Sequence, residues 1–173
     1  MTTDNNAPEP AISLRVPTST LGAPVHALIA ACPPLDPNSL YCNLLQCSHF
    51  ANTSVAAFLG DQLVGFISGY IIPGQPDTLF VWQVAVHEKG RQQGLASRML
   101  QHILARDVCR PVRFIETTIT EDNAASWRLF LSFAEKMAAE THKSIKFDRQ
   151  QHFAGRHDSE WLLRIGPFET VSH

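Results

Sequence analysis

The sequence lacks the features that mark several common classes of protein. No uninterrupted apolar run reaches about 18 residues, so a membrane-spanning helix is not expected. Residues 1–10 have no basic start followed by an apolar segment, so no secretory signal is expected either. Lys and Arg number 14 against 16 Asp and Glu, a net charge of −2, which argues against general binding to nucleic acid. We therefore expect a soluble cytoplasmic protein whose partner is neither a nucleic acid nor a membrane.

Cysteine pairs and the usual metal-ligand spacings are also missing. The 4 cysteines are widely separated and none forms a C-x-x-C pair, which indicates reduced structural thiols. The late histidines match no standard set of metal ligands; they are His142, His152, His157 and His173. We expect these side chains at the surface and expect no metal. An alternative for His152 and His157 is that they help to shape a pocket.

The chain does contain enough apolar material for one compact domain. Its length is 173 residues and hydrophobic residues make up 45% of it. A chain of this size buries roughly 70% of its extended surface. We predict a flexible tail over residues 1–10 and a single domain over residues 11–173.

Hydrophobic periodicity predicts the elements of this domain. In the first third, a strand over 12–17 precedes two short helices. The first helix is capped by hydroxyls of residues 18–20, and the second starts within 36–39, with Leu40, Leu44 and Leu45 as its apolar stripe. Further strands are expected over 55–59, 63–72, 78–87, 112–119, 144–147 and 161–165. A helix over 95–104 and one capped by Asp122 or Asn123 complete a mixed α/β fold with a largely antiparallel first half.

One segment suggests phosphate binding. A strand over 80–86 leads into the polar turn R-Q-Q-G-L-A at 91–96, and this turn opens a helix. The first turn of a helix has unpaired N–H groups and the positive end of the helix dipole, which favour a phosphate. Gly94 has no Cβ to keep a phosphate away. No Walker motif and no G-x-G-x-x-G occurs, so an NTPase or a dinucleotide site is not expected.

This segment resembles the pyrophosphate-binding signature Q/R-x-x-G-x-G/A of the GCN5-related N-acetyltransferase (GNAT) superfamily, which Arg91, Gly94 and Ala96 match. The resemblance implies a splayed, mostly antiparallel sheet flanked by helices, with acetyl-coenzyme A as cosubstrate between the strands that end at Val86 and begin near Val112. The residues that it implies for cofactor binding are Val84, Val86, Arg91, Gln92, Gln93, Gly94, Leu95, Ala96 and Asn123. The amide of Val84 is expected to polarise the thioester oxygen, and Asn123 is alternatively only a helix cap.

The chain departs from the superfamily at its usual general acid. Many members have a Tyr about seven residues after the Asn, where this chain has Phe130. Only 2 tyrosines exist, Tyr41 and Tyr70. The thiol of the departing coenzyme has a pKa of about 8.5, so its thiolate is a fair leaving group without a dedicated acid. The proton that the departing thiolate takes up is then expected to come from Tyr41 or from water.

A narrower resemblance covers residues 14–168. The chain is similar to the L-2,4-diaminobutyrate acetyltransferase family of ectoine biosynthesis, through P-L-D-P-N-S-L-Y-C-N-L-L-Q at 34–46, V-W-Q-V-A-V at 81–86 and E-T-T-I-T-x-x-N at 116–123. The resemblance implies a homodimer. It also implies an acceptor site in which Asp36 and Glu160 bind amines, Trp82 is a wall and Tyr41 is a hydrogen-bonding neighbour.

The chemistry of the acceptor agrees with this assignment. Diaminobutyrate has two ammonium groups and one carboxylate, so its site needs acidic partners. The reaction expected is direct transfer to the γ (N4) amine in a ternary complex, with Glu160 or Asp36 as proton acceptor. Taken singly, Asp36 is as well explained by a turn, Glu160 by a solvated charge and Trp82 by a core position. Alternative functions are acetylation of another small amine, a polyamine or a protein amine, and acyl-coenzyme A binding without catalysis.

Overall fold

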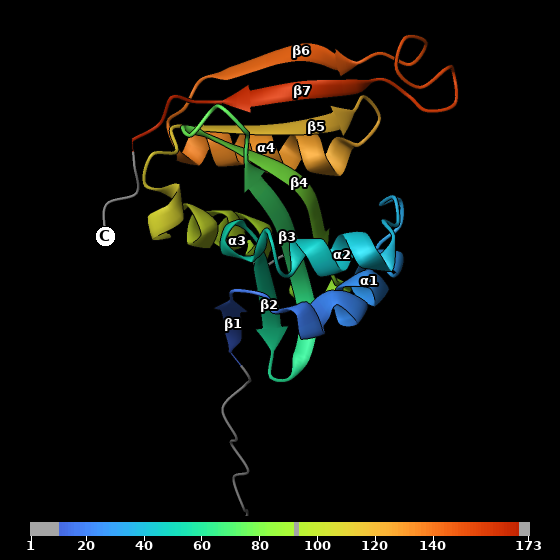
Figure 1. Cartoon of the computed structure of the whole chain (residues 1–173). Helices are drawn as coiled ribbons and strands as arrows, with labels where there is room; N and C mark the ends of the chain where they lie inside the picture. The colour runs from blue at the N-terminus through green and yellow to red at the C-terminus, as the bar shows by residue number, and fades with distance from the viewer. Residues whose placement is uncertain (1–10, 92–93, 170–173) are drawn as a thin grey trace, which may run out of the picture.

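The structure, a computed structural model of the chain, describes residues 11–91 and 94–169. The predicted tail over 1–10, Gln92, Gln93 and His173 lie outside the described residues. The strands are β1 (Ile12–Arg15), β2 (Val55–Leu59), β3 (Gln62–Ile71), β4 (Thr78–Val86), β5 (Phe114–Thr120), β6 (Thr141–Phe147) and β7 (Glu160–Ile165). The α-helices are α1 (Gly22–Ala30), α2 (Leu40–Gln46), α3 (Leu95–Leu104) and α4 (Ala124–Lys136) (Figure 1).

The strands form one sheet in the order β1-β2-β3-β4-β5-β7-β6. Every neighbouring pair is antiparallel except β4 and β5, which are parallel. The parallel pairing is short and runs from Thr78 opposite Phe114 to Phe80 opposite Glu116. Beyond Phe80 the two strands separate, which divides the sheet into two parts (Figure 1). The predicted mixed, mostly antiparallel and splayed sheet is confirmed.

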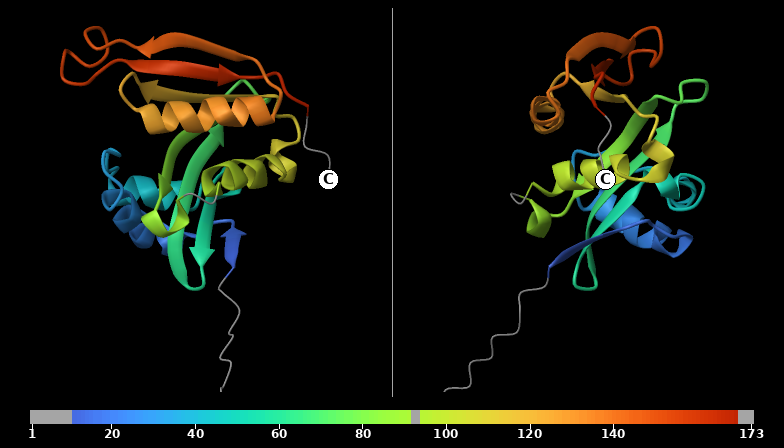
Figure 2. Two further views of the ribbon diagram at one scale, coloured as in Figure 1. Left: turned by 180° about the vertical axis from the view of Figure 1, so that it is seen from behind. Right: turned by 90° about the vertical axis from the view of Figure 1, so that its left-hand side faces the viewer.

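Helices cover both faces of the sheet (Figure 2). One hydrophobic cluster joins the apolar sides of α3 and α4 to the sheet, and it includes Met99, Ile103 and Phe133. A second cluster joins α1 to the opposite face, through Val25, Ile29 and Phe66 among others. The α1–α2 loop is therefore fixed against one face of β4, while α3 and α4 are fixed against the other.

Two N-caps follow the local sequence. The Ser39 side chain accepts a hydrogen bond of 3.1 Å from the N–H of Cys42 and begins α2. Asn123 accepts one of 3.2 Å from the N–H of Ser126 and begins α4. Both satisfy an N–H that a helix start leaves unpaired. Asn123, and not Asp122, is therefore the cap of α4.

The start of α1 and the packing of α2 differ from the prediction. Thr18 forms no side-chain cap, because its hydroxyl pairs with that of Thr20 at 2.8 Å, and α1 begins at Gly22. The buried side chains of α2 are Asn43 and Gln46, and not a stripe of leucines. A hydrogen-bond chain explains this burial: His26 contacts Asn43 at 2.9 Å, and Asn43 donates to Gln46 at 2.9 Å. Leu40 is instead 44% exposed.

Strand boundaries also shift by a few residues. β6 begins at Thr141, three residues earlier than the predicted 144, because pairing with β7 continues to Thr141 opposite Ile165. Within residues 11–91 and 94–169, no helix has the length and hydropathy needed to cross a membrane.

Candidate active site

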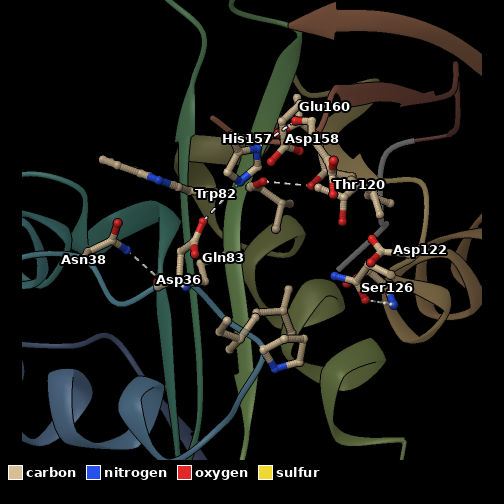
Figure 3. Close-up of a pocket in the computed structure, with 18 of the residues that line it drawn as sticks. Asp36, Asn38, Trp82, Gln83, Thr120, Asp122, Ser126, His157, Asp158 and Glu160 are labelled. Carbon is tan, nitrogen blue, oxygen red and sulfur yellow. Dashed lines mark hydrogen bonds and ion pairs between the residues drawn. The ribbon is translucent and has the colours of Figure 1, made fainter. Parts of the chain in front are cut away.

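A cavity of about 590 Å³ lies where β4 and β5 separate. The two strands supply its inner walls with residues 81–84 and 117–120. The α1–α2 loop supplies Pro34, Leu35, Asp36 and Asn38, and the start of α4 supplies Asp122, Asn123 and Ser126. The β6–β7 loop and the first residue of β7 close the remaining side (Figure 3). The cavity therefore joins segments that are far apart in the sequence.

A side chain marks the point where the strands separate. Thr117 of β5 donates a hydrogen bond of 3.0 Å from its hydroxyl to the carbonyl oxygen of Val81 on β4. This bond follows the last backbone pairing, Phe80 opposite Glu116. From Val81 onward β4 remains paired to β3 on its other edge, with Val84 opposite Ile67. The β5-facing edge of β4 thus borders the cavity with a well-supported backbone.

A bulge in β4 lies at the wall of the cavity. Ser68 of β3 pairs with Gln83, and the next residue, Gly69, pairs with Val81, so Trp82 is the extra residue. Trp82 is 41% exposed and its ring packs edge-on against Phe50 and Tyr70.

Gln83 fixes the α1–α2 loop at the cavity. Its amide nitrogen donates to the carbonyl oxygen of Asp36 at 3.0 Å, and its amide oxygen accepts from Asn38 at 2.9 Å (Figure 3). These two bonds place Asp36 at the mouth of the cavity. The sequence analysis identified neither Asn38 nor Gln83 as a site residue, although both lie inside the segments that carried the family resemblance.

Asp36 contacts the β6–β7 loop across the mouth. Its carboxylate lies 3.4 Å from the Nε2 atom of His157, and its side chain is 84% exposed (Figure 3). The other ring nitrogen of His157 lies 2.7 Å from the carbonyl oxygen of Asp158. That hydrogen bond raises the pKa of His157, and the carboxylates of Glu160 and Asp36 raise it further. The loop histidine therefore holds its proton more tightly than a free imidazole does.

Glu160 occupies a more enclosed position at the start of β7. It is half-buried, and burial raises the pKa of its carboxyl group. The charge of Asp36 adds to this rise, while His157 and a hydrogen bond with Thr118 lower the pKa. A carboxylate with a raised pKa is a better proton acceptor than one in water.

The described residues of the cofactor turn predicted at 91–96 follow β4 and a short 3-10 helix (Glu88–Gly90). Gly94 has φ +62°, a left-handed conformation that favours glycine, and a Cβ added there would meet nothing within 4 Å. Leu95 is buried in the core, so its side chain packs in the core and is not available to a ligand. The Arg91 side chain donates to the carbonyl oxygen of Val86 at 3.2 Å. That carbonyl therefore already has a partner, and Arg91 is turned back onto the strand end.

Apart from Tyr41, the predicted site residues divide into three groups. Asp36, Trp82, Val84, Asn123 and Glu160 all line the cavity. Val86 at the end of β4 and the turn residues Arg91, Gly94, Leu95 and Ala96 are not among the described lining residues. Gln92 and Gln93 lie outside the described residues.

Tyrosine is not brought to the cavity. Tyr41 is 70% exposed on α2 and is not among the described residues that line the cavity. The reason is that α2 turns the other way to bury Asn43 and Gln46. Phe130 is buried in the core of α4. No group of three or more metal-ligating side chains occurs in the part of the chain that the structure describes.

Comparisons with known proteins agree with this geometry. Residues 25–134 match the acetyltransferase (GNAT) family. The chain is 59% identical over 162 residues to the L-2,4-diaminobutyric acid acetyltransferase of Methylotuvimicrobium alcaliphilum, with 94% of each protein covered. It is 48% identical to the Vibrio cholerae protein of the same name, with 87% of each covered. The solved structure of diaminobutyrate acetyltransferase EctA from Paenibacillus lautus, in complex with L-2,4-diaminobutyric acid and coenzyme A, is similar with a TM-score of 0.87 and 38% identity. That match covers 94% of this chain and 99% of the other.

Proposed function

Because this chain belongs to the acetyltransferase (GNAT) family, and within it to the L-2,4-diaminobutyrate acetyltransferases, we propose that it acetylates L-2,4-diaminobutyrate with acetyl-coenzyme A. The observation that carries this proposal is the cavity between β4 and β5, which places the carboxylates of Asp36 and Glu160 beside an open strand edge. The reaction is the acetylation step of ectoine biosynthesis, the pathway of a compatible solute made under osmotic stress.

The charges of the cavity suit a compact diamino acid. At neutral pH the acceptor has two ammonium groups, because an aliphatic amine has a pKa of about 10 and is protonated below that pH. Asp36 at the exposed mouth holds the α-ammonium group. The γ-nitrogen then extends inward along Trp82 toward Glu160 and the β4 edge. Product is formed at N4 because only this nitrogen reaches the thioester, so position decides the selectivity.

Glu160 acts as the proton acceptor for the attacking amine. An ammonium group has no lone pair, so the γ-nitrogen must lose a proton before it attacks. The raised pKa of Glu160 brings that carboxylate closer to the basicity that proton removal requires. The open position of Asp36 at the mouth gives it the binding role and leaves the proton transfer to Glu160.

The backbone of β4 and the turn that follows it hold the acyl donor. The donor supplies an activated acetyl group as a thioester. The N–H of Val84 binds the thioester oxygen and stabilises the negative charge that develops there. The first turn of α3 with Gly94, and Asn123 at the start of α4, hold the diphosphate and the pantetheine arm. Arg91 reaches the diphosphate with the guanidinium nitrogens that the Val86 contact does not use.

The departing thiolate takes its proton from water. Phe130 replaces the usual acid and Tyr41 is exposed on α2. Because the thiol has a pKa of about 8.5, its thiolate leaves without a dedicated acid.

We propose in addition that the enzyme works in the cytoplasm as a homodimer. Support for pairing comes from β6, an edge strand on which Ile145 is 51% exposed and Phe147 is 40% exposed. Light scattering coupled to size-exclusion chromatography tests this, and a mass near 19.2 kDa at micromolar concentration would contradict it.

The activity itself is tested with purified protein, acetyl-coenzyme A and L-2,4-diaminobutyrate. Free thiol should appear in step with 4-acetamido-2-aminobutyrate, identified by NMR. Release of thiol only with a polyamine or a peptide amine would assign another acceptor. Coenzyme A binding without turnover of any amine would assign a non-catalytic module.

A further inference from the structure

The acceptor proposed above also has a carboxylate, and a second charged feature of the cavity matches it. Carboxylates are more numerous than cations around this cavity, which is lined by Asp36, Asp122, Asp158 and Glu160. An anionic substrate group placed among them would be repelled unless a cation is available. The inference that follows rests on the proposed function and identifies that cation.

Two of the three candidate cations already have acidic partners. Arg149 forms an ion pair with Asp158, with its Nη1 atom 3.0 Å from the carboxylate. His157 lies 3.4 Å from the carboxylate of Asp36. Among the residues that the structure describes, no acidic side chain lies within 4.0 Å of the guanidinium of Arg156. Arg156 also lines the cavity, so its charge is available to a ligand.

The position of Arg156 matches the geometry of an amino acid. The α-ammonium and the α-carboxylate are attached to one carbon atom, so their two anchors must be neighbours. Asp36, the proposed partner of the α-ammonium, contacts His157, which directly follows Arg156 in the chain. Glu160, the proposed partner of the γ-amine, lies deeper at the start of β7. The anchors proposed for the α-carboxylate and the α-amine are therefore neighbours, and the anchor proposed for the γ-amine is the more enclosed one.

The loop that presents Arg156 has a defined backbone. The Asp148 carboxylate accepts hydrogen bonds from the N–H groups of Gln150 at 2.8 Å and Gln151 at 2.9 Å. The N–H of Gly155 donates to the carbonyl oxygen of Arg149 at 2.9 Å. The N–H of Arg156 donates to the carbonyl oxygen of Phe153 at 3.0 Å. An anchor on such a loop needs only its side chain to be ordered when the ligand binds.

From these observations we infer that Arg156 binds the α-carboxylate of the acceptor and selects a diamino acid over a diamine that lacks the acid. A guanidinium suits this role because its two parallel N–H groups match the two oxygens of a carboxylate. Arg156 thus selects the substrate by binding its α-carboxylate, a group that takes no part in the reaction at the γ-nitrogen.

The test compares two acceptors that differ only in this group: L-2,4-diaminobutyrate and its carboxamide, in which a neutral amide replaces the carboxylate. For Arg156→Gln we expect kcat/KM for the acid to fall by about tenfold to a hundredfold, the loss typical of charge-assisted hydrogen bonds. For the carboxamide we expect a change below about twofold on the same reasoning. Arg156→Lys keeps the charge and should give an intermediate value. The affinity for coenzyme A should not change.

Arg110→Gln is the matched control, because Arg110 is a surface arginine that pairs with Asp107 and is not among the described lining residues. Equal losses for both acceptors in Arg156→Gln, or no loss for the acid, would overturn the inference while leaving the acetyltransferase assignment intact. Absence of diaminobutyrate acetylation by the wild-type enzyme would overturn both. If circular dichroism shows that Arg156→Gln does not fold, the two acceptors are compared in the wild-type enzyme. Equal kcat/KM values for the acid and the carboxamide would then contradict the inference.

Discussion

The hydroxyl of Thr117 on β5 donates a hydrogen bond of 3.0 Å to the carbonyl oxygen of Val81 on β4, directly after the last backbone pairing of these parallel strands. At the point where the sheet divides, a side-chain hydrogen bond thus joins the two strands in place of backbone pairing. Thr117 is only 4% exposed, so neither partner has water as a substitute. The cavity that carries the proposed chemistry begins at this bond.

Removal of this hydroxyl should weaken the fold at the cavity. Thr117→Val keeps the shape of the side chain but leaves a buried carbonyl without this donor, at a cost of about 1–3 kcal/mol in the free energy of unfolding. Thr117→Ser keeps the donor and should cost less. Urea unfolding of the two variants measures the difference. Equal stabilities for Val and Ser would show that the bond contributes nothing.

Gly94 and Gly74 form a natural pair for testing the coenzyme turn. Both have positive φ, +62° and +81°, and a Cβ added to either would meet nothing within 4 Å. Replacement by Ala should therefore cost each about 1 kcal/mol of stability from backbone strain alone. Only Gly94→Ala should weaken acetyl-coenzyme A binding, by about tenfold, equivalent to about 1.4 kcal/mol. Calorimetry measures both, and equal affinities in the two variants would place the diphosphate elsewhere.

The raised pKa of Glu160 predicts a specific pH profile. Activity requires the carboxylate, so kcat/KM should fall as the pH decreases through a value above the ordinary 4.5. Glu160→Gln should lower kcat by about a hundredfold, a typical loss for a general base, and abolish this acidic limb, with coenzyme A affinity unchanged. Retention of the limb in the variant would assign it to another group.

The same shift has a consequence for stability. Folding raises the pKa of Glu160, so the folded state holds this proton more tightly than the unfolded chain, and the benefit is lost as the pH rises through the folded pKa. Relative to wild type, Glu160→Gln should therefore become more favourable for stability at neutral pH than at pH below 4.5. Unfolding curves at the two pH values check the sign.

The thiols should not take part in transfer. Burial raises the pKa of Cys47 and Cys109 to about 11, so only about one part in a thousand is thiolate at pH 8. The native protein should therefore react slowly with a disulfide reagent at these positions, and Cys42→Ser, at the partly exposed thiol on α2, should retain full activity. An acetylated protein with acetyl-coenzyme A alone, seen by mass spectrometry at a cysteine, would contradict direct transfer.

The local features of this protein are readable along the chain. Ser39 and Asn123 are capping residues at helix starts, and the alternation over 78–87 belongs to a strand, because such patterns depend on neighbours within a few residues. The turn at 91–96 is identifiable for the same reason. The buried faces of short helices are less predictable. α2 buries Asn43 and Gln46 because His26 of α1 supplies a hydrogen-bond partner that no local pattern reveals.

By itself the sequence determined the family, the order of the elements and the strand, turn and helix expected to hold the coenzyme. The tertiary structure decided which charged side chains meet. It joins Asp36 to His157 and Gln83 to Asn38, and it leaves Tyr41 exposed. The physical reason is that the cavity forms between strands that separate after Phe80, so its walls come from segments whose distance depends on the whole sheet and on the helices packed against it.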